Sequence, residues 1–217
     1  RIMRTKHLFI LVYLLILPRL TAQNGEDARA ILDKTYRAYQ ASEGIQLSFT
    51  TSSLDQNGNP SDTQIGEAFI KGDQFKLEMG TMDIWFDGTT QWVLMKEANE
   101  VNISQPNEQE LASISPMALL GMYKTGYSLK KPVPATINGK NSFLIEMIPL
   151  EKNRDFKAVS VAIDKITHTL VQATLTFNNG FKSQIDITKY NANYHYTDSE
   201  FTFKASDYPG VEIVDLR

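Results

Sequence analysis

From Gln46 onward, short stretches of alternating apolar and polar residues are separated by turn dipeptides. The turns pair glycine with asparagine or aspartate, which is typical of β-hairpins. They are Asn57-Gly58, Gly72-Asp73, Asp87-Gly88, Asn138-Gly139 and Asn179-Gly180. Between them we expect strands at residues 46–54, 63–71, 74–79, 83–86, 91–96, 101–104, 127–130, 135–137, 142–149, 158–164, 170–177, 181–190 and 212–214. Because loops this short join antiparallel neighbours, the pattern predicts one continuous antiparallel meander.

A helix is expected before the first strand. Asn24, with Asp27 as its cap partner, precedes apolar residues at helical spacing, and the pattern ends at Gly44. These apolar residues are Ala28, Ile31, Leu32, Thr35 or Tyr36, and Tyr39. The sequence predicts an amphipathic helix of about 18 residues, which needs a sheet to cover its apolar stripe.

The alternation is interrupted once, at residues 105–124. Asn107 and Glu110 form a capping pair before Leu111, and Ser115 is an N-cap followed by Pro116 at the first helical position. The residues that follow are apolar nearly all round the helix: Met117, Leu119, Leu120, Met122 and Tyr123. Such a helix must be buried, so we expect it to fold over the concave side of the sheet and form a lid with the N-terminal helix.

The N-terminus has the pattern of a secretory signal peptide. Arg1, Arg4 and Lys6 precede an apolar run at residues 8–17, and cleavage is expected after Ala22. The run is about half the length that a membrane-spanning helix needs. We therefore expect a signal peptide at residues 1–22, a single domain at residues 23–217 and a periplasmic location.

Composition limits the partners. The chain of 217 residues is 42% hydrophobic, as expected of one soluble globular domain. It has no cysteine, which excludes a disulfide scaffold, a thiolate metal site and a lipid-modified cysteine. Without residues 1–22 it carries 18 basic and 25 acidic residues, so nucleic acid is a poor partner.

Catalysis has little support in the sequence. His168 and His195 have no metal-type spacing, and no common nucleophile, zinc or nucleotide motif is present. An acid pair such as Asp83 and Asp87 would suit a glycosidase, although solvated positions at a turn and a strand end are the simpler interpretation. We expect no enzyme, no metal and no cofactor.

Large apolar side chains are more abundant on the expected strands and lid than a half-exposed sheet needs. The spacing alone fits either a well-filled core or the lining of an apolar ligand cavity. The candidate lining residues are Phe49, Phe69, Phe75, Leu77, Met79, Trp92, Met117, Leu120, Phe143, Ile145 and Met147.

Several motifs, in order and spacing, resemble the periplasmic outer-membrane lipoprotein carrier family, LolA, over about residues 25–216. They are Leu47-Ser48-Phe49-Thr50, Gly66-Glu67-Ala68-Phe69-Ile70-Lys71, Phe75-Lys76-Leu77-Glu78-Met79, Asp87-Gly88-Thr89-Thr90-Gln91-Trp92, Ser115-Pro116-Met117-Ala118-Leu119-Leu120, Phe201-Thr202-Phe203 and Pro209-Gly210-Val211-Glu212-Ile213-Val214-Asp215.

The resemblance implies a mainly β fold, an unclosed antiparallel β-barrel covered by a helical lid. It also implies a monomeric carrier whose cavity shelters the acyl chains of lipoproteins. Its partners would be acylated lipoproteins, an inner-membrane lipoprotein-release transporter and an outer-membrane acceptor. The alternative is a lipid- or lipoprotein-sensing module of the same half-barrel fold, although such relatives usually carry a second domain.

One position departs from the family pattern. Well-known members have an arginine, thought to hold the lid closed, directly after the lysine that ends the second strand, whereas Lys71 is followed here by Gly72. We therefore take Gly72, Pro116 and Met122 as the lid and latch positions. Closure is expected to depend on apolar contacts of the lid and to be insensitive to salt.

Overall fold

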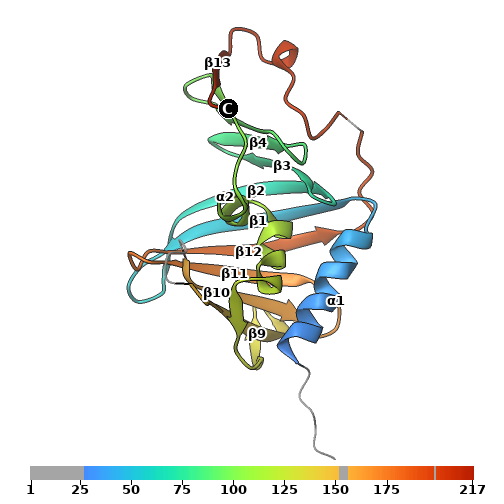
Figure 1. The fold of residues 1–217 in the computed structure, drawn as a ribbon, viewed down its shortest axis with the longest axis vertical. Coiled ribbons are helices and arrows are strands. Elements are labelled where there is room, and N and C mark those ends of the chain that lie inside the picture. The colour runs from blue at the N-terminus through green and yellow to red at the C-terminus, as the bar shows by residue number, and fades with distance from the viewer. Residues whose placement is uncertain (1–26, 152–155, 198) are drawn as a thin grey trace, which may run out of the picture.

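The computed structural model describes residues 27–151, 156–197 and 199–217. The expected signal peptide and Asn24 therefore lie outside the described residues. Figure 1 shows a large curved sheet, with its helices on one side. In the described part of the chain, no helix combines the length and the apolar character needed to cross a membrane.

Thirteen strands of the described residues join into one sheet. They are β1 (Ile45–Leu54), β2 (Pro60–Lys71), β3 (Gln74–Met79), β4 (Met82–Phe86), β5 (Gln91–Met95), β6 (Glu100–Ser104), β7 (Tyr127–Leu129), β8 (Val133–Ile137), β9 (Lys140–Pro149), β10 (Phe156–Asp164), β11 (Leu170–Phe177), β12 (Lys182–Asn191) and β13 (Glu212–Asp215). Every strand expected from the alternation is present. The expectation of a mainly β, unclosed half-barrel is confirmed.

The strand order corrects the expectation of one continuous antiparallel meander. It runs β13-β6-β5-β4-β3-β2-β1-β12-β11-β10-β9-β7, with β8 paired to β9. Two meanders are thus joined by the antiparallel pair β1 and β12, and the helical insertion carries the chain from β6 to the opposite edge. β13 pairs with β6 in parallel, because residues 192–211 are long enough to cross the sheet before the chain pairs again.

Helix α1 (Ala28–Ala41) is shorter than expected, with 14 residues. It begins after Asp27, which is itself the N-cap and makes no side-chain cap bond. It stops at Ser42, whose hydroxyl lies 2.8 Å from the carbonyl oxygen of Ala192. The helix buries the predicted stripe against the sheet: Ala28, Ile31, Leu32, Thr35 and Tyr39.

The insertion forms α2 (Glu108–Ile114), α3 (Pro116–Gly121) and the 3-10 helix η1 (Met122–Lys124), as the capping signals predict. The Glu110 carboxylate accepts from the Asn107 N–H at 2.8 Å, while the Asn107 side chain accepts from the Glu110 N–H at 3.0 Å. Ser115 caps α3 by accepting from the Ala118 N–H. We call α2, α3 and η1 the lid.

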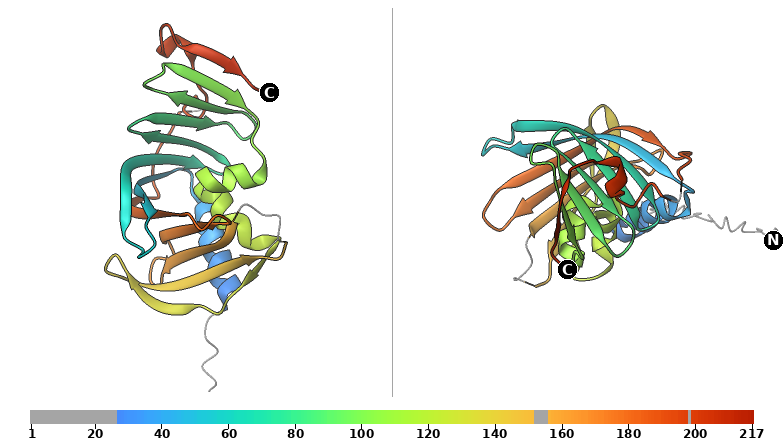
Figure 2. Two further views of the ribbon diagram at one scale, coloured as in Figure 1. Left: turned by 90° about the vertical axis from the view of Figure 1, so that its left-hand side faces the viewer. Right: turned by 90° about the horizontal axis from the view of Figure 1, so that it is seen from above.

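The two faces of the sheet bury different sets of residues. The inner face is the concave side of the curved sheet in Figure 2. It packs against α1 and the lid, and together they form the main core. The outer face of β4 to β6 is covered by part of the segment of residues 192–197 and 199–211, which we call the C-terminal strap. There Trp85 packs edge-on against Phe203 and Tyr208, with ring centroids 5.4 and 5.8 Å apart. Because both faces are covered, alternation does not reveal which face holds the main core.

Candidate functional site

A cavity of about 270 Å³ lies between the inner face of the sheet and the lid. Its walls come from β1, β3, β4, β11 and β12, and its roof comes from α2 and α3. The lining residues are Leu47, Phe49, Thr51, Leu77, Met79, Met82, Ile84, Ala112, Ile114, Ser115, Pro116, Leu119, Leu170, Ala173, Ile185 and Ile187. None of these is charged, so the cavity suits an apolar group.

Gly66 gives the wall its shape at Phe49. The two residues are paired across β1 and β2. A Cβ atom on residue 66 would lie 2.5 Å from Cζ of the Phe49 ring, a distance that real atoms do not reach. Glycine therefore lets the Phe49 ring pack directly against the backbone of β2 at residue 66.

A second cavity, of about 440 Å³, lies on the other side of the lid. It reaches Tyr36 of α1 and Phe86 of β4, and charged residues line it at Asp73, Glu108 and Lys124. Ala112 and Ser115 line both cavities. The junction of α2 and α3 is thus the wall between an apolar cavity and a more polar one.

The end of the lid is tied to α1 by polar contacts. The hydroxyl of Tyr123 donates to the carboxylate of Asp33 at 2.5 Å, and Arg29 donates to the Tyr123 carbonyl at 3.3 Å. The ammonium of Lys124 lies 3.2 Å from the centroid of the Tyr36 ring. Burial and the bond to Asp33 both raise the pKa of Tyr123. The lid end thus has polar ties to α1 in addition to its apolar contacts. Asp33 and Tyr123 are far apart in the sequence, so their pairing leaves no local pattern.

Gly72 lies in the turn between β2 and β3 with a φ of 54°. This left-handed conformation favours glycine, so the turn itself accounts for the residue. Its neighbour Asp73 lines the second cavity. An arginine at position 72 would have to adopt the same strained backbone.

The model of the family "Outer membrane lipoprotein carrier protein LolA" matches residues 19–180. The chain belongs to the LolA family. No curated protein sequence gives a significant match.

Several solved structures are similar to this chain at low sequence identity. An uncharacterized conserved protein from Thermus thermophilus matches with a TM-score of 0.57 at 11% identity, over 87% of this chain and 98% of that chain. A LolA superfamily protein from Nitrosomonas europaea gives a TM-score of 0.45 at 11% identity, over 82% and 98% of the two chains. MucB in the Pseudomonas aeruginosa MucA/MucB complex gives 0.41 at 14% identity, over 81% and 60%.

The structure brings some of the predicted site residues of this LolA-family chain to the two cavities. Phe49, Leu77, Met79 and Pro116 line the apolar cavity. Met117 and Met122 line the second cavity. Four others are buried in the main core without lining either cavity: Phe75, Leu120, Ile145 and Met147.

Three predicted residues lie elsewhere. Phe69 lies on the outer face, where its ring centroid is 5.1 Å from that of Tyr194, because its neighbours Ala68 and Ile70 take the inner face of β2. Trp92 packs beside the outer cluster around Trp85. Phe143 is half-buried at the edge of the core, with the ammonium of Lys165 4.8 Å from its ring centroid.

Other lining residues were not among the predictions. Leu170, Ala173, Ile185 and Ile187 belong to β11 and β12, which the sequence shows as strands. Their alternation is visible, but the pairing of β12 with β1 that brings them to the cavity is not local.

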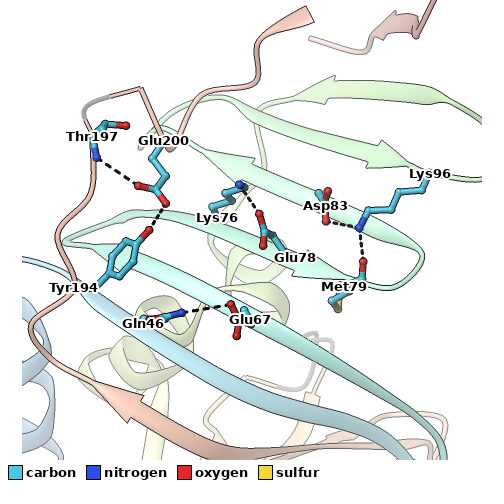
Figure 3. Close-up of polar contacts among 10 residues, drawn as sticks. All are labelled: Gln46, Glu67, Lys76, Glu78, Met79, Asp83, Lys96, Tyr194, Thr197 and Glu200. Atoms are coloured by element: carbon cyan, nitrogen blue, oxygen red, sulfur yellow. Dashed lines mark hydrogen bonds and ion pairs between the residues drawn. The ribbon is translucent and has the colours of Figure 1, made fainter. Parts of the chain in front are cut away.

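The candidate acid pair does not converge on a site. The carboxylate of Asp87 accepts from the backbone N–H groups of Thr89 and Thr90, at 2.9 and 2.8 Å, and so stabilises a turn. Asp83 is on the outer face, 2.8 Å from the ammonium of Lys96, as Figure 3 shows. His168 Nε2 lies 2.8 Å from the ammonium of Lys34. These contacts explain the residues structurally and favour no glycosidase.

Proposed function

We propose that this protein carries the acyl chains of lipoproteins in the apolar cavity beneath the lid, across the periplasm from the inner to the outer membrane. The supporting observation is the uncharged cavity between sheet and lid in a chain of the LolA family. Acylated lipoproteins would be the cargo, and an inner-membrane transporter and an outer-membrane acceptor would be the partners. No covalent step and no cofactor enters the proposal.

The physical need for such a cavity is large. Each methylene that leaves water contributes about 0.8 kcal/mol, so a lipoprotein with several acyl chains does not cross an aqueous space unaided. A carrier must cover these chains and still release them. Met79 and Met82 in the wall suit this role, because the flexible thioether side chain adapts to apolar ligands of irregular shape.

The lid must move for loading. A volume of about 270 Å³ falls below the roughly 300–1,000 Å³ of sites that enclose a drug-sized ligand. Since the α2–α3 junction separates the two cavities, its displacement would join them into one larger space. The ties of Tyr123 and Lys124 to α1 would then hold the empty protein closed.

Binding of a fluorescent triacylated lipopeptide, compared with the same peptide without acyl chains, tests the proposal. We expect saturable binding of the acylated peptide and transfer of it from the protein to acceptor vesicles. Equal binding of both peptides would contradict an acyl-chain site. Tight binding without any transfer would assign the cavity to a sensing module instead of a carrier.

A further inference from the structure

The turn between β10 and β11 holds an aliphatic side chain out in solvent. Ile166 is 84% exposed. The turn is well ordered by its own bonds: the Asp164 carboxylate accepts from the N–H groups of Ile166 and Thr167 at 2.7 and 3.0 Å, and the His168 N–H donates to the Asp164 carbonyl. A defined backbone thus presents Ile166 to solvent.

Basic residues of α1 and β9 lie near this turn, which itself contains Lys165. Lys34 of α1 contacts His168, and Arg37 follows one helical turn later and is also exposed. The Lys165 N–H donates to the Asn141 carbonyl at 2.9 Å, which places the exposed Lys140 beside the turn. We call Lys34, Arg37, Lys140 and Lys165, together with Ile166, the basic patch.

The acids near the basic patch have partners of their own. Asp164 is 7% exposed. Its burial raises the pKa, but the backbone bonds and the charge of Lys140 outweigh that effect and hold the pKa below its ordinary value. Asp186 accepts from the side-chain amides of Asn138, Gln172 and Gln184 at 2.7 to 2.8 Å. Asp33 accepts from Tyr123. These carboxylates keep their negative charge, but the four cations of the basic patch outnumber them.

Charge is segregated along the whole chain. Residues 42–114 contain twelve acidic and three basic residues, whereas residues 115–191 contain five acidic and ten basic residues. In Figure 1, β9 and β10 lie at the end of the molecule opposite β13. Without residues 1–22 the net charge is −7, yet the chain has a basic end and an acidic end, which orients it in front of a charged surface.

We propose that the basic patch docks the protein on an anionic phospholipid membrane, with the cations at the headgroup phosphates and Ile166 inserted among the lipids. Each lysine near an anionic surface strengthens binding by about fivefold, and one aliphatic side chain adds about tenfold. A membrane fits better than an acidic protein, because a single projecting aliphatic residue enters a lipid surface, whereas protein interfaces centre on a packed apolar core. This proposal goes beyond cargo binding and does not depend on it.

Docking would also bring the lid close to the membrane. Arg37 in the patch and Asp33 are four residues apart on α1 and so share one face, and Asp33 accepts from Tyr123 at the end of the lid. Since the lid end contacts Tyr36 through Lys124, the membrane would lie near the element that must move for cargo transfer.

Flotation of the cargo-free protein with phosphatidylcholine vesicles, with and without phosphatidylglycerol, tests the docking. We expect binding only when phosphatidylglycerol is present, and weaker binding at high salt. Lys34→Gln and Lys165→Gln should each weaken it about fivefold and Ile166→Ser about tenfold. Lys204→Gln and Leu150→Ser are matched controls at exposed positions outside the patch and should stay within about twofold.

Thermal melts equal to that of the parent protein would show that the exposed substitutions leave the fold intact. Binding that is the same with and without phosphatidylglycerol would overturn the proposal. So would equal losses in Lys34→Gln and Lys204→Gln. Binding to soluble polyglutamate, with none to the anionic vesicles, would assign the patch to an acidic protein and also overturn it.

Discussion

The hydroxyl of Tyr123 donates a hydrogen bond to the carboxylate of Asp33, and this bond ties the end of the lid to α1. We predict that Tyr123→Phe loosens the lid. The lost charge-assisted bond should lower the free energy of unfolding by about 1 kcal/mol, since Asp33 is only half-buried and regains water. Stopped-flow mixing with a fluorescent acyl probe should show faster uptake and release.

Tyr208→Phe is the control for that change, because Tyr208 belongs to the strap and packs against Trp85 on the outer face, away from the lid. It should leave the exchange rate of the probe unchanged. Equal exchange rates in Tyr123→Phe and the parent protein would show that this bond does not govern the lid.

A larger side chain at Ala173, which lines the apolar cavity, distinguishes a true cavity from a filled core. Ala173 and Ala68 are both almost fully buried, but only Ala173 lines the apolar cavity. We predict that Ala173→Phe fills the cavity, abolishes acyl-chain binding and leaves the unfolding free energy within about 1 kcal/mol of the parent. Ala68→Phe should overpack the core and cost about 1–3 kcal/mol or more.

Urea unfolding and probe titration of the same two variants check this contrast. Similar destabilisation by both substitutions would favour the interpretation of a filled core. Undiminished probe binding in a folded Ala173→Phe variant would place the acyl chain elsewhere.

Gly66 controls the position of the Phe49 ring. In Gly66→Ala the new methyl group should push the ring into the apolar cavity and weaken acyl binding by about tenfold, with a loss of about 1–3 kcal/mol in stability. Gly80→Ala is the matched control, since a Cβ there meets no atom within 4 Å. If both variants bind the probe as the parent does, the close approach of Gly66 to Phe49 has no role in cavity shape.

Because of Tyr194 in the C-terminal strap, we predict that the free energy of unfolding falls at high pH. Burial, the hydrogen bond to Glu200 and the negative charges of Glu200, Glu78 and Glu67 raise the pKa of Tyr194 to about 12 (Figure 3). Below the ordinary tyrosine pKa of about 10, Tyr194 is protonated in both states and its contribution is fully present. Between pH 10 and about 12 the unfolded chain loses this proton first, so stability should fall as pH rises.

Urea unfolding at a series of pH values measures the slope of the unfolding free energy against pH. Tyr194→Phe should make the slope shallower. Glu200→Gln should narrow the pH range over which stability falls, because it removes the carboxylate that accepts a hydrogen bond from Tyr194. A slope that is the same in all three proteins would contradict the assignment to Tyr194.

Local patterns were enough to predict the elements of the fold. Alternation and turn dipeptides gave the strands, and the caps at Asn107 and Ser115 gave the lid helices. The strand partners were not local: neither the β1–β12 pair nor the parallel β13 leaves a signal in sequence spacing. Alternation places Phe69 and Trp92 in the cavity because it does not distinguish the two faces. The strap makes the outer face of β2 and β5 apolar as well.

The central claim is that acyl chains occupy the cavity between the sheet and the lid. Photo-crosslinking with a lipopeptide that carries a diazirine near the end of one acyl chain, followed by peptide mapping, tests it most directly. The account predicts adducts on peptides that contain Phe49, Leu77 or Ile185, and their loss in Ala173→Phe. Adducts confined to the outer face around Trp92 and Phe203, unchanged in Ala173→Phe, would contradict it.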